Sequence, residues 1–308
     1  MSAASACPRN DERDATVSVL MPCFNHERYV VQALQSVAGS TYPRIEMILI
    51  DDASTDDSFV VAQAWLTANE KRFTRTVCLR HQANQGISAT LNQLVSLACG
   101  RFIAFIASDD LLVADGIAKQ VACSISHRAE FIFADSRLID ESGAVIADSA
   151  IRYFGRNPAQ LQRPSCLIVD VLLNWEAPWT RIFATAALIR ELGLFDESLH
   201  FEDRDFVVRV ISRGSFALLP DPVYCYRIRL GNRLTPRLDS AKMHLDYLRA
   251  EANNFRGARG LARAILALNV LAGKVRFDRD GAARSSWIWP PFAALRRLLA
   301  RAHLLAMR

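Results

Sequence analysis

Short apolar runs alternate with helically spaced apolar residues through about the first 110 residues of the chain. The runs predict buried strands at 17–21, 45–50, 76–80 and 101–107. Between them, apolar residues recur every three or four positions, which predicts helices over 27–38, from a Ser54 or Thr55 cap to about residue 67, and over 84–98. Four strand–helix repeats indicate a Rossmann-like α/β fold with a doubly wound, mostly parallel sheet.

The second half of the chain is less regular. The pattern predicts a strand at 130–134, a hairpin at 137–147, a loop at 149–164, and short helices at 167–173, 185–192 and 201–212. Two extended runs in 217–226 are broken by Pro220 and Pro222. A helix up to Leu271, a break at 277–283 and a further helix to Met307 predict a helical C-terminal extension.

Acidic pairs follow two of the predicted strands. Asp51-Asp52 comes after the second strand, and Asp109-Asp110 comes after the fourth. One such pair alone is typical of a helix cap or a turn. Ligands of open α/β sheets bind outside the carboxyl ends of the strands, and like charges gathered there repel unless a cation or a donor-rich ligand lies between them. The two pairs together therefore favour a nucleotide–metal site.

Six short motifs occur in order along the chain: 19–25 (VLMPCFN), 50–56 (IDDASTD), 84–86 (NQG) with Asn92, 105–110 (FIASDD), 193–196 (GLFD) and 201–203 (FED). Together they resemble the family 2 inverting glycosyltransferases of the GT-A fold, over about residues 16–230. The resemblance implies a flexible N-terminus at 1–14, a glycosyltransferase GT-A domain at 15–232 and a basic helical C-terminal extension at 233–308.

The resemblance also implies a binding site for a nucleotide-sugar donor. Asp52 would accept a hydrogen bond from the base, Pro22 and Phe24 would form a wall of the base pocket, and Asp109 would hold the ribose or help to place the metal. Asp110 would ligate Mg²⁺ or Mn²⁺, which suit carboxylate and phosphate oxygens. By the same resemblance, Asn25 would belong to the donor site. Two other interpretations stay open: Phe24 as a core residue and Asn25 as a helix cap.

Inversion at the anomeric carbon is a single displacement and needs one general base near the acceptor hydroxyl. Asp203 matches the position of that base in the family, and the neighbouring Glu202 would repel it and help to raise its pKa. An acid in the first turn of a helix is the alternative interpretation of Asp203. Asp205 is expected to support the site or to pair with Arg209, four residues later.

Two positions depart from the family pattern. Ala107 stands where many relatives carry an additional aspartate, and Arg229 stands where they often carry a histidine. Arg229 cannot ligate a cation, but its guanidinium would suit the donor diphosphate. On the acceptor side, Trp175, Trp179 and Glu202 are the candidate residues. The two tryptophans have an equal alternative as core aromatics.

The charge of the chain is divided unevenly. Its net charge is +5, but residues 251–308 contain eleven basic and three acidic residues, so the first 250 residues carry −3. Trp287, Trp289 and an arginine-backed apolar stripe are typical of an interfacial helix, and packing on the catalytic body is the alternative. No recognition motif for nucleic acid accompanies the basic charge.

Composition excludes several other classes. With 51% hydrophobic residues and nearly balanced charge, the chain is not intrinsically disordered. Its seven cysteines and six histidines are scattered, so neither a disulfide framework nor a zinc site is expected. No secretory signal and no transmembrane run is recognisable, which predicts a cytoplasmic protein whose membrane contact is peripheral at the inner face.

The leading hypothesis is an inverting transferase that moves a sugar, carried by UDP, to a hydroxyl acceptor on a glycan or a lipid-linked carrier during polysaccharide or lipopolysaccharide synthesis. The first alternative is a catalytically silent protein that binds a nucleotide sugar or a partner enzyme. The second is a sugar nucleotidyltransferase, which usually has a glycine-rich basic loop where this chain has 21–25 (MPCFN).

Overall fold

The first two predicted strands form as expected. They are β1, Val17–Cys23, and β2, Ile45–Asp51, and they pair in parallel from Val17 opposite Ile45 to Cys23 opposite Asp51. Every residue of β2 and all but one of β1 are buried, because strands of a parallel sheet are covered on both faces. This pairing brings the ends of the two strands to one edge of the sheet.

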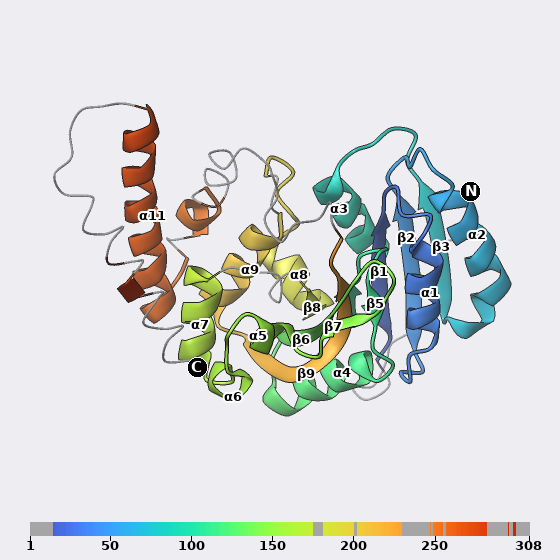
Figure 1. Cartoon of the computed structure of the whole chain (residues 1–308), viewed down its shortest axis with the longest axis horizontal. Helices are drawn as coiled ribbons and strands as arrows, with labels where there is room; N and C mark the ends of the chain where they lie inside the picture. Colours follow the sequence, from blue (N-terminus) through green and yellow to red (C-terminus); the bar gives the residue numbers. More distant parts are fainter. Residues whose placement is uncertain are drawn as a thin grey trace. The chain divides into compact units, whose positions relative to one another are not determined.

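The computed structural model describes residues 15–174, 181–199, 202–229, 247, 249–254, 257–281, 295, 298 and 299 (Figure 1). The chain divides into two compact units. The first comprises residues 1–132, 181–194 and 222–227, and the second comprises residues 133–180, 195–221 and 228–308. The predicted domain boundary at 232 and the predicted flexible segment 1–14 lie outside the described residues.

The first unit is built on a mostly parallel sheet in the order β3-β2-β1-β4-β8. Strands β1 to β4 are parallel and β8 is antiparallel to β4. The remaining strands of this unit are β3 Arg75–Arg80, β4 Phe102–Phe105, β5 Leu111–Leu112 and β8 Phe183–Thr185. Its helices are α1 Val30–Ala38, α2 Ser58–Asn69, the 3-10 helix η2 Glu70–Arg72, α3 Ile87–Leu97, α4 Gly116–His127 and α8 Ala186–Leu192. The predicted α/β class is confirmed.

Two long strands belong to both units. Strand β6, Phe131–Ile139, starts beside β8 in the first unit and then pairs with β7, Val145–Ala147, in the second, which confirms the predicted hairpin. Strand β9, Phe216–Arg227, ends in the first unit, where it pairs with β5. The helices of the second unit are α5 Ala150–Tyr153, α6 Pro158–Leu161, α7 Pro164–Leu173, α9 Glu202–Arg213 and α11 Gly260–Gly281.

Two buried ion pairs hold the helices of the second unit. Arg156 pairs with Asp170 of α7 at 2.6 Å, and both side chains are at most 1% exposed. Arg204 of α9 pairs with Glu251 at 2.5 Å. Helix α11 packs on α7 and α9 (Figure 1), where the side chain of Asn269 donates to the carbonyl of Leu172. The predicted helical C-terminal region is therefore present. No described helix combines the length and apolar character needed to cross a bilayer.

The predicted loop at 149–164 was wrong, because α5 and α6 lie within it. Ser149 and Asn157 accept the first free backbone N–H groups of these helices, and Pro158 occupies the first helical position, where its missing N–H costs nothing. Gly155, at φ 75°, lies between the two helices. The polar residues, glycine and proline of this segment therefore mark the boundaries of two short helices.

Other predicted boundaries also shift. Strand β9 is continuous through Pro220 and Pro222, since prolines two positions apart withhold N–H groups from the same edge of a strand. Helix α11 continues without the predicted break up to Gly281. Helix α2 begins at Ser58, and neither Ser54 nor Thr55 caps it.

Candidate active site

Most of the predicted donor-site residues lie in the first unit, directly after three neighbouring parallel strands. Strand β1 lies between β2 and β4, with Cys23 opposite Asp51 and Leu20 opposite Phe105. Pro22 is the second-last residue of β1, and the segments that follow the three strands contain Phe24, Asn25, Asp52, Asp109 and Asp110. In parallel α/β sheets this edge is where ligands bind.

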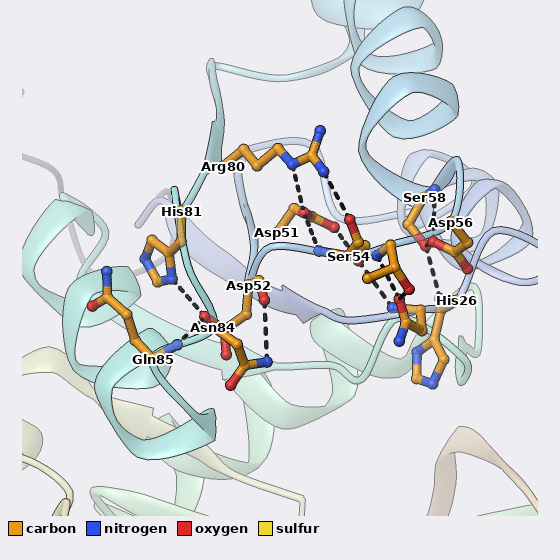
Figure 2. A network of polar contacts seen from close by, with 12 residues as sticks. His26, Asp51, Asp52, Ser54, Asp56, Ser58, Arg80, His81, Asn84 and Gln85 are labelled. Atoms are coloured by element: carbon orange, nitrogen blue, oxygen red, sulfur yellow. Dashed lines mark hydrogen bonds and ion pairs between the residues drawn. The ribbon is translucent and has the colours of Figure 1, made fainter.

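Asp52 holds the loop that precedes α3. Its Oδ1 accepts the backbone N–H of Gln85 at 2.8 Å (Figure 2). Its Oδ2 accepts the backbone N–H of Gly86 at 2.9 Å. The Nδ1 atom of His81 lies 2.7 Å from Oδ1, and its Nε2 lies 2.7 Å from Oε1 of Gln93. A carboxylate oxygen accepts two hydrogen bonds, so among the described residues Oδ1 is filled and Oδ2 keeps one position for a ligand.

Asn25 joins the end of β1 to the end of β2. It adopts a left-handed conformation at φ 54°, its N–H donates to Oγ of Ser54 at 2.9 Å, and its Oδ1 accepts the N–H of Thr55 at 2.8 Å. The interpretation of Asn25 as a helix cap is wrong, since α1 begins at Val30. The interpretation of Phe24 as a core residue is also wrong, because the residue is 44% exposed.

The carboxylates of Asp51 and Asp56 form a second set of polar contacts, between the end of β2 and the start of α2. Ser54 donates to Asp51 at 2.5 Å, and the guanidinium of Arg80 lies 3.4 Å from Asp51 (Figure 2). The Asp56 side chain accepts the N–H of Ser58 at the start of α2. The pKa of Asp56 is lowered, because these hydrogen bonds outweigh its partial burial. Asp56 thus stabilises the first turn of α2.

Two arginines surround the Asp109-Asp110 pair. The backbone N–H of Arg227 donates to Oδ1 of Asp110 at 2.8 Å, its Nε donates to the carbonyl of Asp109 at 2.7 Å, and its Nη2 donates to Gln32. Arg181 forms an ion pair with Oδ2 of Asp110. Burial, partly offset by Arg181, raises the pKa of Asp110 to about 6. The acidic pair is therefore balanced by two guanidinium groups.

The Asp110 arrangement does not fit the predicted metal ligand. Each of its oxygens already has a cationic or N–H partner, one in Arg181 and one in Arg227, so a metal ion would have to share this carboxylate with a guanidinium, and the residue is 1% exposed. Across the part of the chain that the structure describes, no three or more His, Cys, Asp or Glu side chains are gathered as a cation site requires. No catalytic step is assigned to a cation on Asp110.

The sequence interpretation missed Arg181, Arg227 and His81. His81 follows β3 in the same way that the acidic pairs follow β2 and β4, so the strand-end rule could have found it. Arg227 lies two residues before Arg229, the position at which the chain departs from the family pattern. No local signal marks Arg181, because its partner Asp110 is 71 residues away.

The predicted catalytic base Asp203 lies in the second unit, in the first turn of α9. Its Oδ1 accepts the N–H of Arg204 at 2.7 Å. Burial and the charge of Asp203 raise the pKa of Glu202 to about 8, and the same two causes raise the pKa of Tyr247 to about 12. Glu202 and Tyr247 thus favour their neutral forms beside Asp203.

The other predicted residues of the second unit have different outcomes. Asp205 pairs with Arg209 at 2.9 Å, which confirms that expectation. Arg229 is half-buried, and its contact with a diphosphate stays a prediction. Trp175 and Trp179 lie outside the described residues.

The segment that contains the first four parallel strands and most of the donor-site residues matches one protein family. Residues 18–168 match the family described as glycosyl transferase family 2. This segment is a family 2 glycosyltransferase domain. The matched region contains the three strand ends and their acidic residues.

Named relatives and a solved structure agree with this family. The chain is 32% identical over 203 residues to an uncharacterized glycosyltransferase of Rickettsia felis, covering 66% of this chain and 31% of that protein. It is 28% identical over 144 residues to WfgD of Escherichia coli, a UDP-Glc:alpha-D-GlcNAc-diphosphoundecaprenol beta-1,3-glucosyltransferase, covering 46% of this chain and 54% of that enzyme. The chain thus spans about a third to a half of these relatives.

The structure of Staphylococcus aureus TarS 1–349 in complex with UDP-GlcNAc has the same fold. The TM-score is 0.64 at 18% identity, and the match covers 94% of this chain and 88% of that one. This chain therefore has the GT-A type of fold that its motifs predicted.

Proposed function

We propose that this chain is an inverting glycosyltransferase that moves a sugar from a nucleotide-sugar donor, with UDP as the nucleotide, to a hydroxyl acceptor. The observation that carries the proposal is the gathering of Asp52, Asp109 and Asp110 at the ends of neighbouring parallel strands, within the residues that match the family. The UDP-sugar named for WfgD supports the choice of nucleotide.

The donor base is assigned to Asp52. The remaining acceptor position on Oδ2 suits a base that carries a ring N–H, and the other hydrogen bonds of Asp52 hold its carboxylate still. Phe24 is exposed enough to contact a flat ring, and Pro22 would complete that wall. Asp109 is assigned to the ribose.

The reaction itself needs one base. The acceptor hydroxyl oxygen forms a bond to the anomeric carbon and loses its proton to Asp203. The bond between that carbon and the phosphate oxygen breaks, and its electron pair leaves with the nucleoside diphosphate. The resemblance implies Mg²⁺ or Mn²⁺ as the counter-charge of the leaving group. The contacts of Asp110 with Arg181 and Arg227 do not favour Asp110 as a ligand of such an ion.

The acceptor is assigned to the class of lipid-linked sugar diphosphates, since WfgD acts on one. Leu295, Leu298 and Leu299 of the basic extension are 44%, 64% and 42% exposed, and their spacing places them on one helical face. This apolar face supports a peripheral contact with an anionic membrane. Exchange of all three residues for Ser should reduce flotation with phosphatidylglycerol vesicles, and unchanged flotation would contradict the contact.

The proposal is tested by a thermal-shift panel of UDP-, GDP- and ADP-sugars, followed by a transfer assay with the sugar that stabilises the chain most. Asp203→Asn should lower the transfer rate about 10²- to 10⁴-fold and leave donor affinity unchanged. Asp221→Asn, a half-buried acid outside the motifs, is the control. Binding without transfer in the wild-type chain would favour the silent alternative, and synthesis of the nucleotide sugar would favour a nucleotidyltransferase.

A further inference from the structure

A group of two carboxylates and two guanidiniums lies at the carboxyl end of β4. Asp109 and Asp110 are 6% and 1% exposed, and Arg227 is 1% exposed. Arg181 forms an ion pair with Asp110 and lies over the ring of Tyr226, 4.8 Å from its centre. All of these residues belong to the first unit.

The acidic pair was the physical reason to expect a divalent cation. Two adjacent carboxylates repel, and a cation between them is one solution. In this chain Arg181 and Arg227 supply that compensation, since both guanidiniums contact the pair or its backbone. The repulsion that favoured a metal ion is therefore removed by residues of the chain itself.

We propose that Arg181 supplies the positive charge that binds the donor diphosphate, so that donor binding and transfer do not depend on a divalent cation. This inference rests on the proposed glycosyltransferase function. A guanidinium presents its N–H donors in a planar fork that matches phosphate oxygens. Asp110 is then a positioning residue, which holds Arg181 at the strand end.

Arg227 is unsuited to the same role. Its Nε and Nη2 atoms donate to the Asp109 carbonyl and to Gln32, and its guanidinium lies 4.9 Å from the centre of the Tyr29 ring. These contacts bury it almost completely. The side chain of Arg181 keeps 12% of its surface exposed. Burial lowers the pKa of Arg181, but the surrounding acidic groups, Asp110 foremost, together outweigh burial and raise it. Arg181 is the cation of the group that a solvent-borne ligand can reach.

The test measures the affinities of UDP and uridine by calorimetry on the full chain, with excess EDTA and with Mn²⁺. We expect UDP affinity in EDTA to lie within about twofold of that in Mn²⁺. Arg181→Gln should weaken UDP about 10- to 100-fold and leave uridine unchanged, because only the diphosphate loses a charged partner. Arg181→Lys should recover part of the loss. Arg28→Gln, an exposed arginine, is the matched control.

UDP binding that requires Mn²⁺ would overturn the inference, and so would equal losses of UDP and uridine affinity in Arg181→Gln. The EDTA comparison uses the wild-type chain, so it decides the question even if the variant does not fold. The transfer assay is repeated in EDTA, and we expect the wild-type transfer rate to lie within about twofold of the rate in Mn²⁺. If no nucleoside diphosphate binds with or without Mn²⁺, the proposed function itself fails, and this outcome is distinct from a metal requirement.

Discussion

The backbone N–H of Arg227 donates a hydrogen bond of 2.8 Å to Oδ1 of Asp110, although the two residues are 117 positions apart. The Arg227 side chain adds a bond of 2.7 Å to the carbonyl of Asp109. The end of β9 thereby fixes both acids that follow β4. A carboxylate held from two sides in this way is part of the framework of the site, whatever ligand it faces.

Arg227→Lys should lower the free energy of unfolding by about 2–4 kcal/mol, because a lysine cannot make the forked contacts and leaves buried polar groups unsatisfied. Urea denaturation measures the change. Arg28→Lys is the matched control, since Arg28 also lies near the Tyr29 ring, at 6.0 Å, but is exposed. Its effect should stay within about 0.5 kcal/mol. Equal losses in the two variants would contradict the structural role of Arg227.

The positions of the strand ends could be predicted from the sequence, because each depends only on the order of apolar and acidic residues within one short segment. An apolar run followed by an acid is recognisable in a single segment, and Asp52 and Asp109 were found in this way. The parallel order of the strands then follows from the helices between them. What the pattern could not supply is which distant side chain neutralises each acid.

The unpredicted features all depend on contacts between distant segments. Arg181 and Arg227 reach Asp110 across 71 and 117 residues. Helix α3 ends at Leu97, and the space around the following Gly100 is filled by Ser18 and Thr16 of another segment. The periodicity of one segment contains no information about such close approaches.

Gly100→Ala tests this close approach. A Cβ atom there would lie 2.6 Å from Oγ of Ser18 and 2.7 Å from both the Ser18 nitrogen and the Thr16 carbonyl oxygen, and these backbone atoms cannot move aside. The free energy of unfolding should fall by about 1–3 kcal/mol. Gly39→Ala, whose nearest contact is at 3.4 Å with φ −74°, should change stability by less than about 0.5 kcal/mol. A tolerated Gly100→Ala would show that this contact relaxes easily.

Asp52→Asn should weaken both the fold and the binding of the donor. Whichever way the amide is turned, its NH₂ group faces a backbone donor, Gln85 on one side or Gly86 on the other. The unpaired donors should cost about 1–3 kcal/mol of unfolding free energy, and uridine affinity should fall by a similar amount. Asp57→Asn, at an exposed position next to α2, is the control. Loss of stability with full uridine affinity would assign Asp52 to the fold alone.

Glu202 should make the chain less stable as the pH rises. Burial first and the charge of Asp203 second raise the pKa of Glu202 from 4.5 to about 8, so the folded protein holds a proton that the unfolded chain has released. Stability linked to this group is therefore complete below pH 4.5, falls between pH 4.5 and 8, and is constant above 8.

Glu202→Gln removes that titration. The free energy of unfolding of the variant should equal that of the wild-type chain at about pH 4.5 and exceed it by about 1–2 kcal/mol at about pH 8.5. This difference is smaller than the full value of about 1.4 kcal/mol per unit of pKa shift, because Glu202 is only half-buried and solvent screens its charge. Urea unfolding at both pH values measures the difference. Glu197→Gln, at an exposed position before α9, is the control and should show no such dependence. A variant that loses stability equally at both pH values would indicate that Glu202 is ionised in the folded chain.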